Sequence, residues 1–414
     1  APGSSRRTDP PAMNTPSSGA TRRRFLRAVA GGAACAGLGW LNLRAPRATE
    51  TDTSDGKTKG VFRLWATGCA HVGTDLRAGR RSLAEAIGQS ERGGRQGGPP
   101  FDWDIAVHLG DLSGSQTSPG DEEGREVVRQ LAAASKHRRE QFYHLAGNHD
   151  ASGPGEPTMQ WFRKWVDPTG ENRKTSEVDP AKRPYPVHGT WERYWFRAGN
   201  LLFLMMSDRN DGGPPVGRGK RGGYPAGAVS GETFRWWHEM VEANRDAVII
   251  SAHHHMLKGT TVASGPWEGF TKAPDGRWRS RYHGYFPEGA PQGASYLYFV
   301  DGKPDAGAFE RYLAARPGAI DLWLGGHTHT HPDDRTGGRS HIERKWGATF
   351  INVAALTRFH GRAHSVPMSR LLTFTEGSNK VRVQCYLHTS QYAPQGWYAK
   401  AERVIELGGP FRPA

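Results

Sequence analysis

Short apolar runs recur along the chain, separated by stretches in which apolar residues are spaced three to four apart. The apolar runs predict strands over residues 61–67, 104–109, 141–146, 201–207, 247–252, 320–324, 349–354, 370–375 and 380–387. The spaced pattern predicts helices over 81–89, 122–135, 231–243 and 306–315. Strands that alternate with helices favour an α/β fold, in which functional groups gather at the carboxyl ends of the strands.

Four of the predicted strands end in Gly or a small residue that is followed by metal-ligand types. The four segments are Gly110-Asp111, Gly147-Asn148-His149-Asp150, His253-His254-His255 and Gly326-His327-Thr328-His329. Any one of them alone is compatible with an ordinary turn, because Gly, Asn and Asp favour turns. Four such ends in succession predict a site.

This order of motifs (G-D, G-N-H-D, a His cluster, G-H-x-H) resembles the calcineurin-like metallophosphoesterases over residues 60–330. That family opens with D-x-H after its first strand, whereas this chain has Cys69-Ala70-His71. The resemblance implies a four-layer αββα sandwich with two mixed β-sheets. Purple acid phosphatases carry a Tyr ligand shortly after the G-D motif, and none follows Asp111 here, which argues against that subfamily.

The resemblance also implies a dinuclear metal site, with Asp111 as the bridging carboxylate. The first metal ion would take Cys69, His71, Asp111 and His329. The second would take Asp111, the carbonyl oxygen of Asn148, one His of the 253–255 cluster and His327. We favour His253, the first polar residue after its strand, with His254 as the alternative. His149 would stabilise or protonate the leaving oxygen, and Asp150 would orient it. We assign no role to His255, His331 or His144.

Replacement of the first Asp by Cys69 changes the expected metal preference. A thiolate is a good ligand for zinc or iron, so we expect Zn or Fe at the Cys69 site and allow Mn at the other. Two alternatives stay open: the first site is weak or empty, or Cys69 forms a disulfide with Cys385.

We therefore predict a metal-dependent phosphoric ester hydrolase. Two metal ions clamp a phosphoryl group and activate water as hydroxide, for a phosphomonoester or a phosphodiester. One alternative is a non-catalytic or single-metal binding protein on the same fold. Another is a related metal-dependent chemistry, such as iron–thiolate redox or hydrolysis of a non-phosphate ester.

Residues 1–50 differ from the rest of the chain. Thr21-Arg22-Arg23-Arg24-Phe25-Leu26, followed by the weakly apolar run 28–43, resembles a twin-arginine export signal. This predicts a partnership with the twin-arginine translocase, a periplasmic or extracellular location, and no stable membrane span in the mature protein. We expect a catalytic domain over 58–390 and a tail over 391–414 that packs on it.

The formal net charge is +14, and residues 1–50 carry eight Arg against Asp9 and Glu50, which leaves +8 for the remainder. This suits an anionic phosphate-ester substrate, although a basic surface that serves only solubility fits equally well. No basic stripe interleaved with aromatic residues is present, so no specific nucleic-acid binding is predicted. The aromatic-rich stretch 256–300 predicts a lid-like insertion.

Overall fold

The computed structural model describes residues 60–114, 119–150, 160–210, 226–264, 270–272, 278–280, 296–300, 303–304, 307–358 and 366–413. The predicted leader and twin-arginine signal lie outside these residues, as does most of the predicted lid, and both stay predictions. In the part that is described, no helix has the length and apolar character to cross a membrane.

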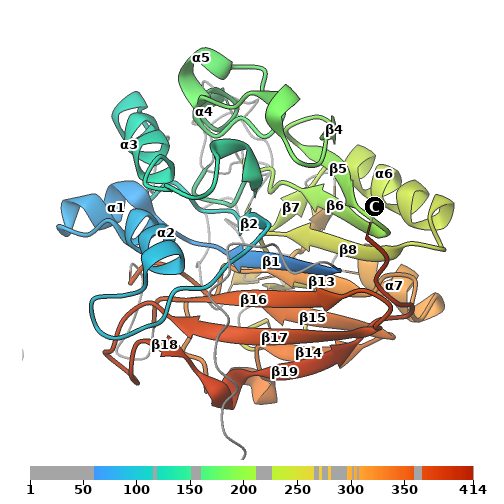
Figure 1. Ribbon diagram of the computed structural model, residues 1–414. Coiled ribbons are helices and arrows are strands. Elements are labelled where there is room, and N and C mark those ends of the chain that lie inside the picture. Colours follow the sequence, from blue (N-terminus) through green and yellow to red (C-terminus); the bar gives the residue numbers. More distant parts are fainter. Residues whose placement is uncertain are drawn as a thin grey trace, which may run out of the picture. The chain divides into compact units, whose positions relative to one another are not determined.

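The first sheet combines three parallel strands with an antiparallel extension. Its strands are β1 (Val61–Thr67), β2 (Ile105–Leu109), β3 (Phe142–Leu145), β16 (Met368–Thr375), β17 (Lys380–Leu387), β18 (Gly396–Trp397) and β19 (Arg403–Glu406). The strand order is β18-β17-β16-β1-β2-β3, with β19 also paired to β17 (Figure 1). Strands β1, β2 and β3 are parallel, and β16 joins β1 in the antiparallel sense.

The second sheet has the same plan, with four parallel strands at its centre. In sheet order its strands are β14 (Ile342–Lys345), β15 (Ala348–Asn352), β13 (Leu322–Gly325), β8 (Val248–His253), β6 (Leu201–Met206), β5 (Arg193–Ala198) and β4 (His188–Gly189). Strands β15, β13, β8 and β6 are parallel, and the outer strands are antiparallel. In a smaller sheet, β11 (Phe299–Val300) pairs with both β7 (Ala228–Val229) and β12 (Lys303–Pro304). In another, β9 (Phe270–Lys272) pairs with β10 (Trp278–Ser280).

Helices cover the outer face of each sheet. They are α1 (Val72–Arg77), α2 (Ser82–Arg92), α3 (Asp121–Leu131), α4 (Gln160–Trp165), α5 (Arg173–Ser176), α6 (Gly231–Ala243) and α7 (Ala308–Ala315). Trp65 of β1 packs against Leu83 of α2, Val127 of α3 and Trp161 of α4. On the second sheet, the covering residue is Trp237 of α6.

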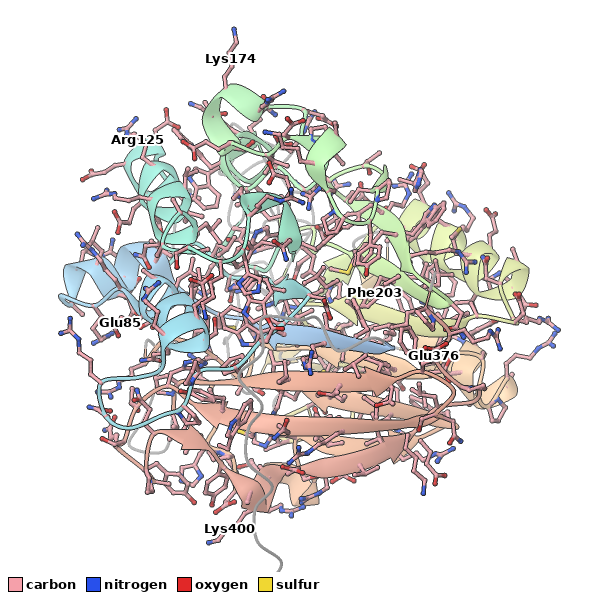
Figure 2. The ribbon with its side chains drawn as sticks, in the orientation of Figure 1. Glu85, Arg125, Lys174, Phe203, Glu376 and Lys400 are labelled. Atoms are coloured by element: carbon pink, nitrogen blue, oxygen red, sulfur yellow. The ribbon has the colours of Figure 1, made fainter. Side chains whose placement is uncertain are left out.

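The central core lies between the two sheets. Leu64 and Val107 of the first sheet meet Ile250 and Leu322 of the second, and Phe203, labelled in Figure 2, belongs to the same cluster. The order is therefore helices, sheet, sheet, helices, which confirms the predicted αββα sandwich with two mixed sheets. Its consequence for function is that parallel strands of both sheets deliver their carboxyl ends to one region.

Candidate metal centre

The predicted ligands follow five strands drawn from both sheets. Cys69 and His71 come after β1, Asp111 after β2 and Asn148 after β3; His254 follows β8, and His327 and His329 follow β13. These segments are far apart in the sequence, but backbone hydrogen bonds join them in the folded chain. Cys69 N–H donates to Gly110 O at 2.9 Å, for example, and Gly326 N–H donates to His254 O at 2.8 Å.

The backbone is strained where the ligands sit. Cys69, His71, Asp111 and His327 all have positive φ, at 51°, 44°, 60° and 68°. This left-handed region is unfavourable for residues with a Cβ and is tolerated where the surrounding structure enforces it, often at functional sites. The strained turns aim these side chains into a common centre.

Two glycines allow the turns after β2 and β3 to approach closely. A Cβ on Gly110, whose φ is 88°, would lie 2.6 Å from Gly147 N, and a Cβ on Gly147 would lie 2.3 Å from Asp111 Oδ1. Neither contact is physically possible. The Gly in each motif is therefore required by the packing of the two loops that hold Asp111 and Asn148.

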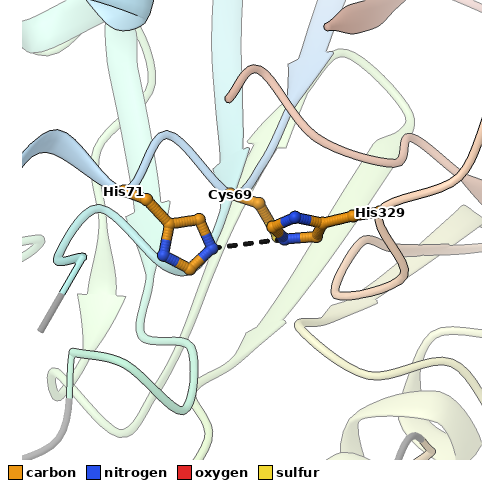
Figure 3. A group of neighbouring side chains, drawn as sticks. All are labelled: Cys69, His71 and His329. Atoms are coloured by element: carbon orange, nitrogen blue, oxygen red, sulfur yellow. Dashed lines mark hydrogen bonds between the residues drawn. The ribbon is translucent and has the colours of Figure 1, made fainter. Parts of the chain in front are cut away.

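Cys69, His71 and His329 form the first donor group around Asp111 (Figure 3). His71 Nε2 lies 3.2 Å from His329 Nε2 and 3.6 Å from Asp111 Oδ2. Cys69 Sγ lies 4.0 Å from the same carboxylate oxygen. The geometry thus brings together the four residues predicted for the first metal ion.

His254, rather than His253, belongs to the second donor group. Its Nε2 lies 3.1 Å from Asp111 Oδ2 and 3.2 Å from His327 Nδ1. Its Nδ1–H donates to Leu109 O at 2.6 Å, which fixes the orientation of the ring with Nε2 toward Asp111. In the metal-free protein burial opposes protonation of His254, but the Asp111 charge outweighs it and raises the pKa of His254 to about 9. A metal ion at Nε2 would displace that proton.

The preference for His253 is corrected by this geometry. Neighbouring residues on a strand point to opposite faces, so the side chain before His254 turns away from Asp111. His253 Nδ1 instead accepts a hydrogen bond from the backbone N–H of His255 at 2.9 Å. His253 groups with Asp208 and His255, and among the described residues it shares no donor group with Asp111.

The two oxygens of Asn148 differ in their partners. Its backbone oxygen already accepts a hydrogen bond from Asn210 Nδ2 at 2.5 Å. Asn148 Oδ1 is buried and has no hydrogen-bond partner among the described residues, a costly state that a metal ion would relieve. The Asn148 carbonyl oxygen expected as a ligand is therefore the one in the side chain.

The two predicted catalytic residues take different places. His149 packs its ring against that of His71, with centroids 4.7 Å apart, and its backbone N–H donates to Asp111 Oδ1 at 2.7 Å. Asp150 accepts hydrogen bonds at 2.8 Å from the backbone N–H groups of Asp111, Ser113 and Gly147. This geometry has Asp150 fix the turns after β2 and β3, and its orientation of His149 stays a prediction.

The buried acids influence one another strongly. Burial alone would raise the pKa of Asp111, but the imidazoles of His254, His149 and His71 outweigh it, and this pKa lies well below its usual range. Burial, and then the Asp111 charge, raise the pKa of Asp150 and that of the Cys69 thiol. Asp111 is thus the carboxylate that stays ionised, as a bridging ligand must.

Two residues near the centre lacked a functional assignment from sequence. Asp208, which follows β6, places Oδ2 2.8 Å from His255 Nδ1, and both side chains are fully buried. His255 packs its ring on His327, with centroids 4.1 Å apart. A strand end followed by a carboxylate is the same signal that identified Asp111, and it marks Asp208 as well.

The chemistry of the donors fits a pair of transition-metal ions. Sulfur, imidazole nitrogen and carboxylate oxygen come together here, and within each group of three residues the donor atoms all lie within 4.8 Å of one another. Cys69 and Cys385 are both free thiols, which excludes the alternative of a disulfide between them in this structure.

A protein-family model identifies the family of the chain. The model of the calcineurin-like phosphoesterase family matches residues 62–331, so the chain belongs to this family. Among solved structures, it is similar to vacuolar protein sorting 29 from Cryptosporidium parvum at 11% identity, covering 84% of this chain and 100% of that chain, with a TM-score of 0.29. No curated protein matches.

Proposed function

We propose that the protein is a dinuclear metal-dependent phosphoesterase that hydrolyses an anionic phosphomonoester or phosphodiester. The observation that carries the proposal is the convergence of donors on Asp111. Oδ2 faces His254 Nε2 at 3.1 Å and His71 Nε2 at 3.6 Å, so a single carboxylate oxygen stands between both donor groups. Family membership supports the same class of reaction.

Each donor group would hold one ion. Cys69, His71, Asp111 and His329 suit the first, and Zn or Fe is favoured there because of the thiolate. Asp111, Asn148 Oδ1, His254 and His327 suit the second, where Mn is also acceptable. Such a pair supplies Lewis acidity toward a phosphoryl group and a nucleophile derived from water near neutral pH.

The remaining chemistry falls to side chains of the chain itself. His149 packs its ring beside that of His71, and its backbone N–H donates to Asp111. From this place its imidazole would donate a hydrogen bond to a phosphoryl or leaving oxygen. Asp150 holds the backbone of Asp111 and Gly147 and so keeps the centre in place. The side chain of Asn210 donates a hydrogen bond to the backbone oxygen of Asn148 and so holds Asn148 in place.

Replacement of His149 by Ala separates catalysis from metal binding. We expect His149→Ala to keep both metal ions by elemental analysis and to lose roughly 10²–10⁴-fold in turnover, the range typical of a general acid or base. The measurement is hydrolysis of chromogenic phosphomonoester and diester substrates by the metal-loaded proteins. Turnover equal to that of the unmodified protein would remove His149 from the reaction.

A further inference from the structure

Arg370 is a buried cation for which the described residues provide no anionic partner. It lies on β16 between Ala66 and Cys385 of the neighbouring strands, and its side chain is 1% exposed. Nη1 makes one long hydrogen bond, to Ala401 O at 3.4 Å. Nε and Nη2 are buried and have no hydrogen-bond partner among the described residues. Because a guanidinium stays protonated in proteins, this charge carries a large desolvation cost.

Arg370 lines a cleft between the β16 region of the first sheet and the segment that leads into β14 of the second. The space inside the cleft that the centre of a water-sized sphere can reach is about 30 Å³. This exceeds the roughly 10–15 Å³ of such space that one water molecule needs. The cleft is open to solvent on one side, so a small ligand can enter it.

The mouth of the cleft carries three more cations. Lys400 stands on η5 (Ala399–Ala401), near β18 and β19, and is labelled in Figure 2. Arg403 begins β19, and Arg335 comes from the loop that follows the metal-ligand motif. All three residues are exposed. Arg403 Nη1 donates to the backbone oxygens of Lys400 at 2.9 Å and Glu402 at 2.7 Å, which holds this guanidinium at the rim of the cleft.

A second buried polar group lines the same space. His341 Nδ1 has no hydrogen-bond partner among the described residues, and His341 Nε2 lies 2.8 Å from Thr330 Oγ1. Burial, followed by the charge of Arg370, lowers the pKa of His341 well below its usual range. The imidazole is therefore neutral, and the positive potential of the cleft comes from the Arg and Lys side chains.

Asp333 is the lining carboxylate, and it is already engaged. Its Oδ2 accepts hydrogen bonds from the hydroxyls of Tyr392 at 2.5 Å and Tyr398 at 2.6 Å. Among the residues that line the cleft, four cations outnumber this one anion. The buried guanidinium thus remains uncompensated by its described neighbours.

We propose that this cleft, defined by Arg335, Arg370, Lys400 and Arg403, binds a tetrahedral oxyanion, either free inorganic phosphate or the phosphate group of a larger molecule. Arg370 supplies a charged hydrogen-bond donor from the floor, and the three exposed cations close over the ligand. The site is separate from the donor groups around Asp111. His341 joins the two regions, because its partner Thr330 follows His329 directly in the chain.

The test is calorimetric titration of the full-length, metal-loaded protein with inorganic phosphate and with sulfate at constant ionic strength. Arg370→Met and Arg403→Ala are the test variants. Arg235→Ala removes the same charge from an exposed position on α6, and Asp111→Asn impairs the metal centre while leaving the cleft intact. We expect one anion at the cleft in addition to any bound by the metal ions, and only the metal-bound anion should be lost in Asp111→Asn. Binding at the cleft should weaken roughly tenfold or more in both test variants and persist in both controls.

The pattern of losses decides the outcome. Anion binding that disappears in Asp111→Asn but survives in Arg403→Ala would overturn the proposal, because the anion would then lie at the metal centre. Arg403 is exposed, so this variant tests the cleft even if Arg370→Met fails to fold. No anion binding in the unmodified protein would equally overturn it.

A third ligand distinguishes free inorganic phosphate from the phosphate group of a larger molecule. Glycerol 3-phosphate, titrated into Asp111→Asn so that it is not hydrolysed, should bind more tightly than inorganic phosphate if the cleft takes phosphate groups of larger molecules. Weaker binding than inorganic phosphate would identify the free ion as the ligand. A selenate soak that places anomalous scattering beside Arg370 supports both versions, and scattering confined to the Asp111 region contradicts both.

Discussion

At the scale of single residues, the histidine cluster after β8 offers the sharpest distinction. His254 faces Asp111, and His253 faces the opposite side of the strand. We expect His254→Ala to lose one of two bound metal ions and most activity. The matched variant His253→Ala should retain both ions. Elemental analysis of the two proteins side by side gives the answer, and metal loss in His253→Ala alone would reverse our assignment.

A second prediction at this scale concerns Cys69: the number of protons released when metal binds, and the preference between zinc and manganese. Burial and the Asp111 charge raise the pKa of the thiol, so Cys69 is protonated at neutral pH before metal binds. A metal ion requires the thiolate, so its binding should release about one proton more than in Cys69→Asp and should tighten as pH rises.

Titration of zinc in buffers of different ionisation enthalpy measures that proton count. The same titrations with manganese should show that Cys69→Asp accepts manganese more readily relative to zinc. An equal proton count and an unchanged preference in the two proteins would argue that Cys69 is not a ligand.

The residues around the centre also show what sequence patterns are able to predict. The ligand types could be recognised because each follows a strand end. The choice within the cluster 253–255 required knowledge of which face of β8 points to Asp111, and a shift of one residue exchanges the faces. Asp150 lies close to the centre, but its partners are backbone N–H groups, which carry no sequence signal.

At the scale of elements, Glu91 at the end of α2 joins this helix to the segment after α3. The carboxylate is 2% exposed and accepts hydrogen bonds from Ser135 N at 2.8 Å, Lys136 N at 3.0 Å and His137 Nδ1 at 2.9 Å. Burial opposes ionisation, but the hydrogen bonds from His137 and Ser135 outweigh it and lower the pKa of Glu91 from 4.5 to about 2. The pKa of His137 is raised in turn: burial opposes this, and hydrogen bonds to Asp102 and Glu91 prevail.

The two shifts set the pH range of this contribution to stability. A lowered acid pKa stabilises fully above the unfolded value of 4.5, and the effect is lost as pH falls toward 2. A raised His pKa stabilises fully below the unfolded value of 6.5, and the effect fades as pH rises through the folded value. The pair therefore contributes most between pH 4.5 and 6.5.

We expect Glu91→Gln to lower the free energy of unfolding by about 2 kcal/mol in that range and by less near pH 3. Glu85→Gln is the matched control, because Glu85 is exposed on the same helix (Figure 2). Urea denaturation at pH 5.5 and 3 measures both. A loss in Glu91→Gln that is the same at the two pH values would show that the charge of Glu91 does not matter.

The pattern of apolar residues predicted some strands and helices better than others. Strand β1 was predicted with its exact bounds, because most of its residues are apolar and buried. The edge strands β4, β14, β18 and β19 are short and partly exposed, so no apolar run marks them. Helix α1 has only six residues and begins at strained His71, and it was likewise not predicted.

At the scale of the whole molecule, two sheets contribute to one centre. The first sheet supplies Cys69, His71, Asp111 and Asn148, and the second supplies His254, His327 and His329, all at the carboxyl ends of parallel strands. The resemblance predicted the sandwich and the donor groups. It gave no sign of the Arg370 cleft, because Arg370 comes from β16 and the other three cations come from segments at least 30 residues away in the chain.

The central claim is that two metal ions at Asp111 perform phosphoester hydrolysis. The most direct test is elemental analysis of the purified protein together with hydrolysis of a chromogenic phosphomonoester and a chromogenic diester, with Asp111→Asn measured in parallel. We predict two metal ions per chain and turnover in the unmodified protein, and loss of both in Asp111→Asn. A metal-loaded protein without turnover on either substrate, or an Asp111→Asn variant as active as the unmodified protein, would contradict this mechanism.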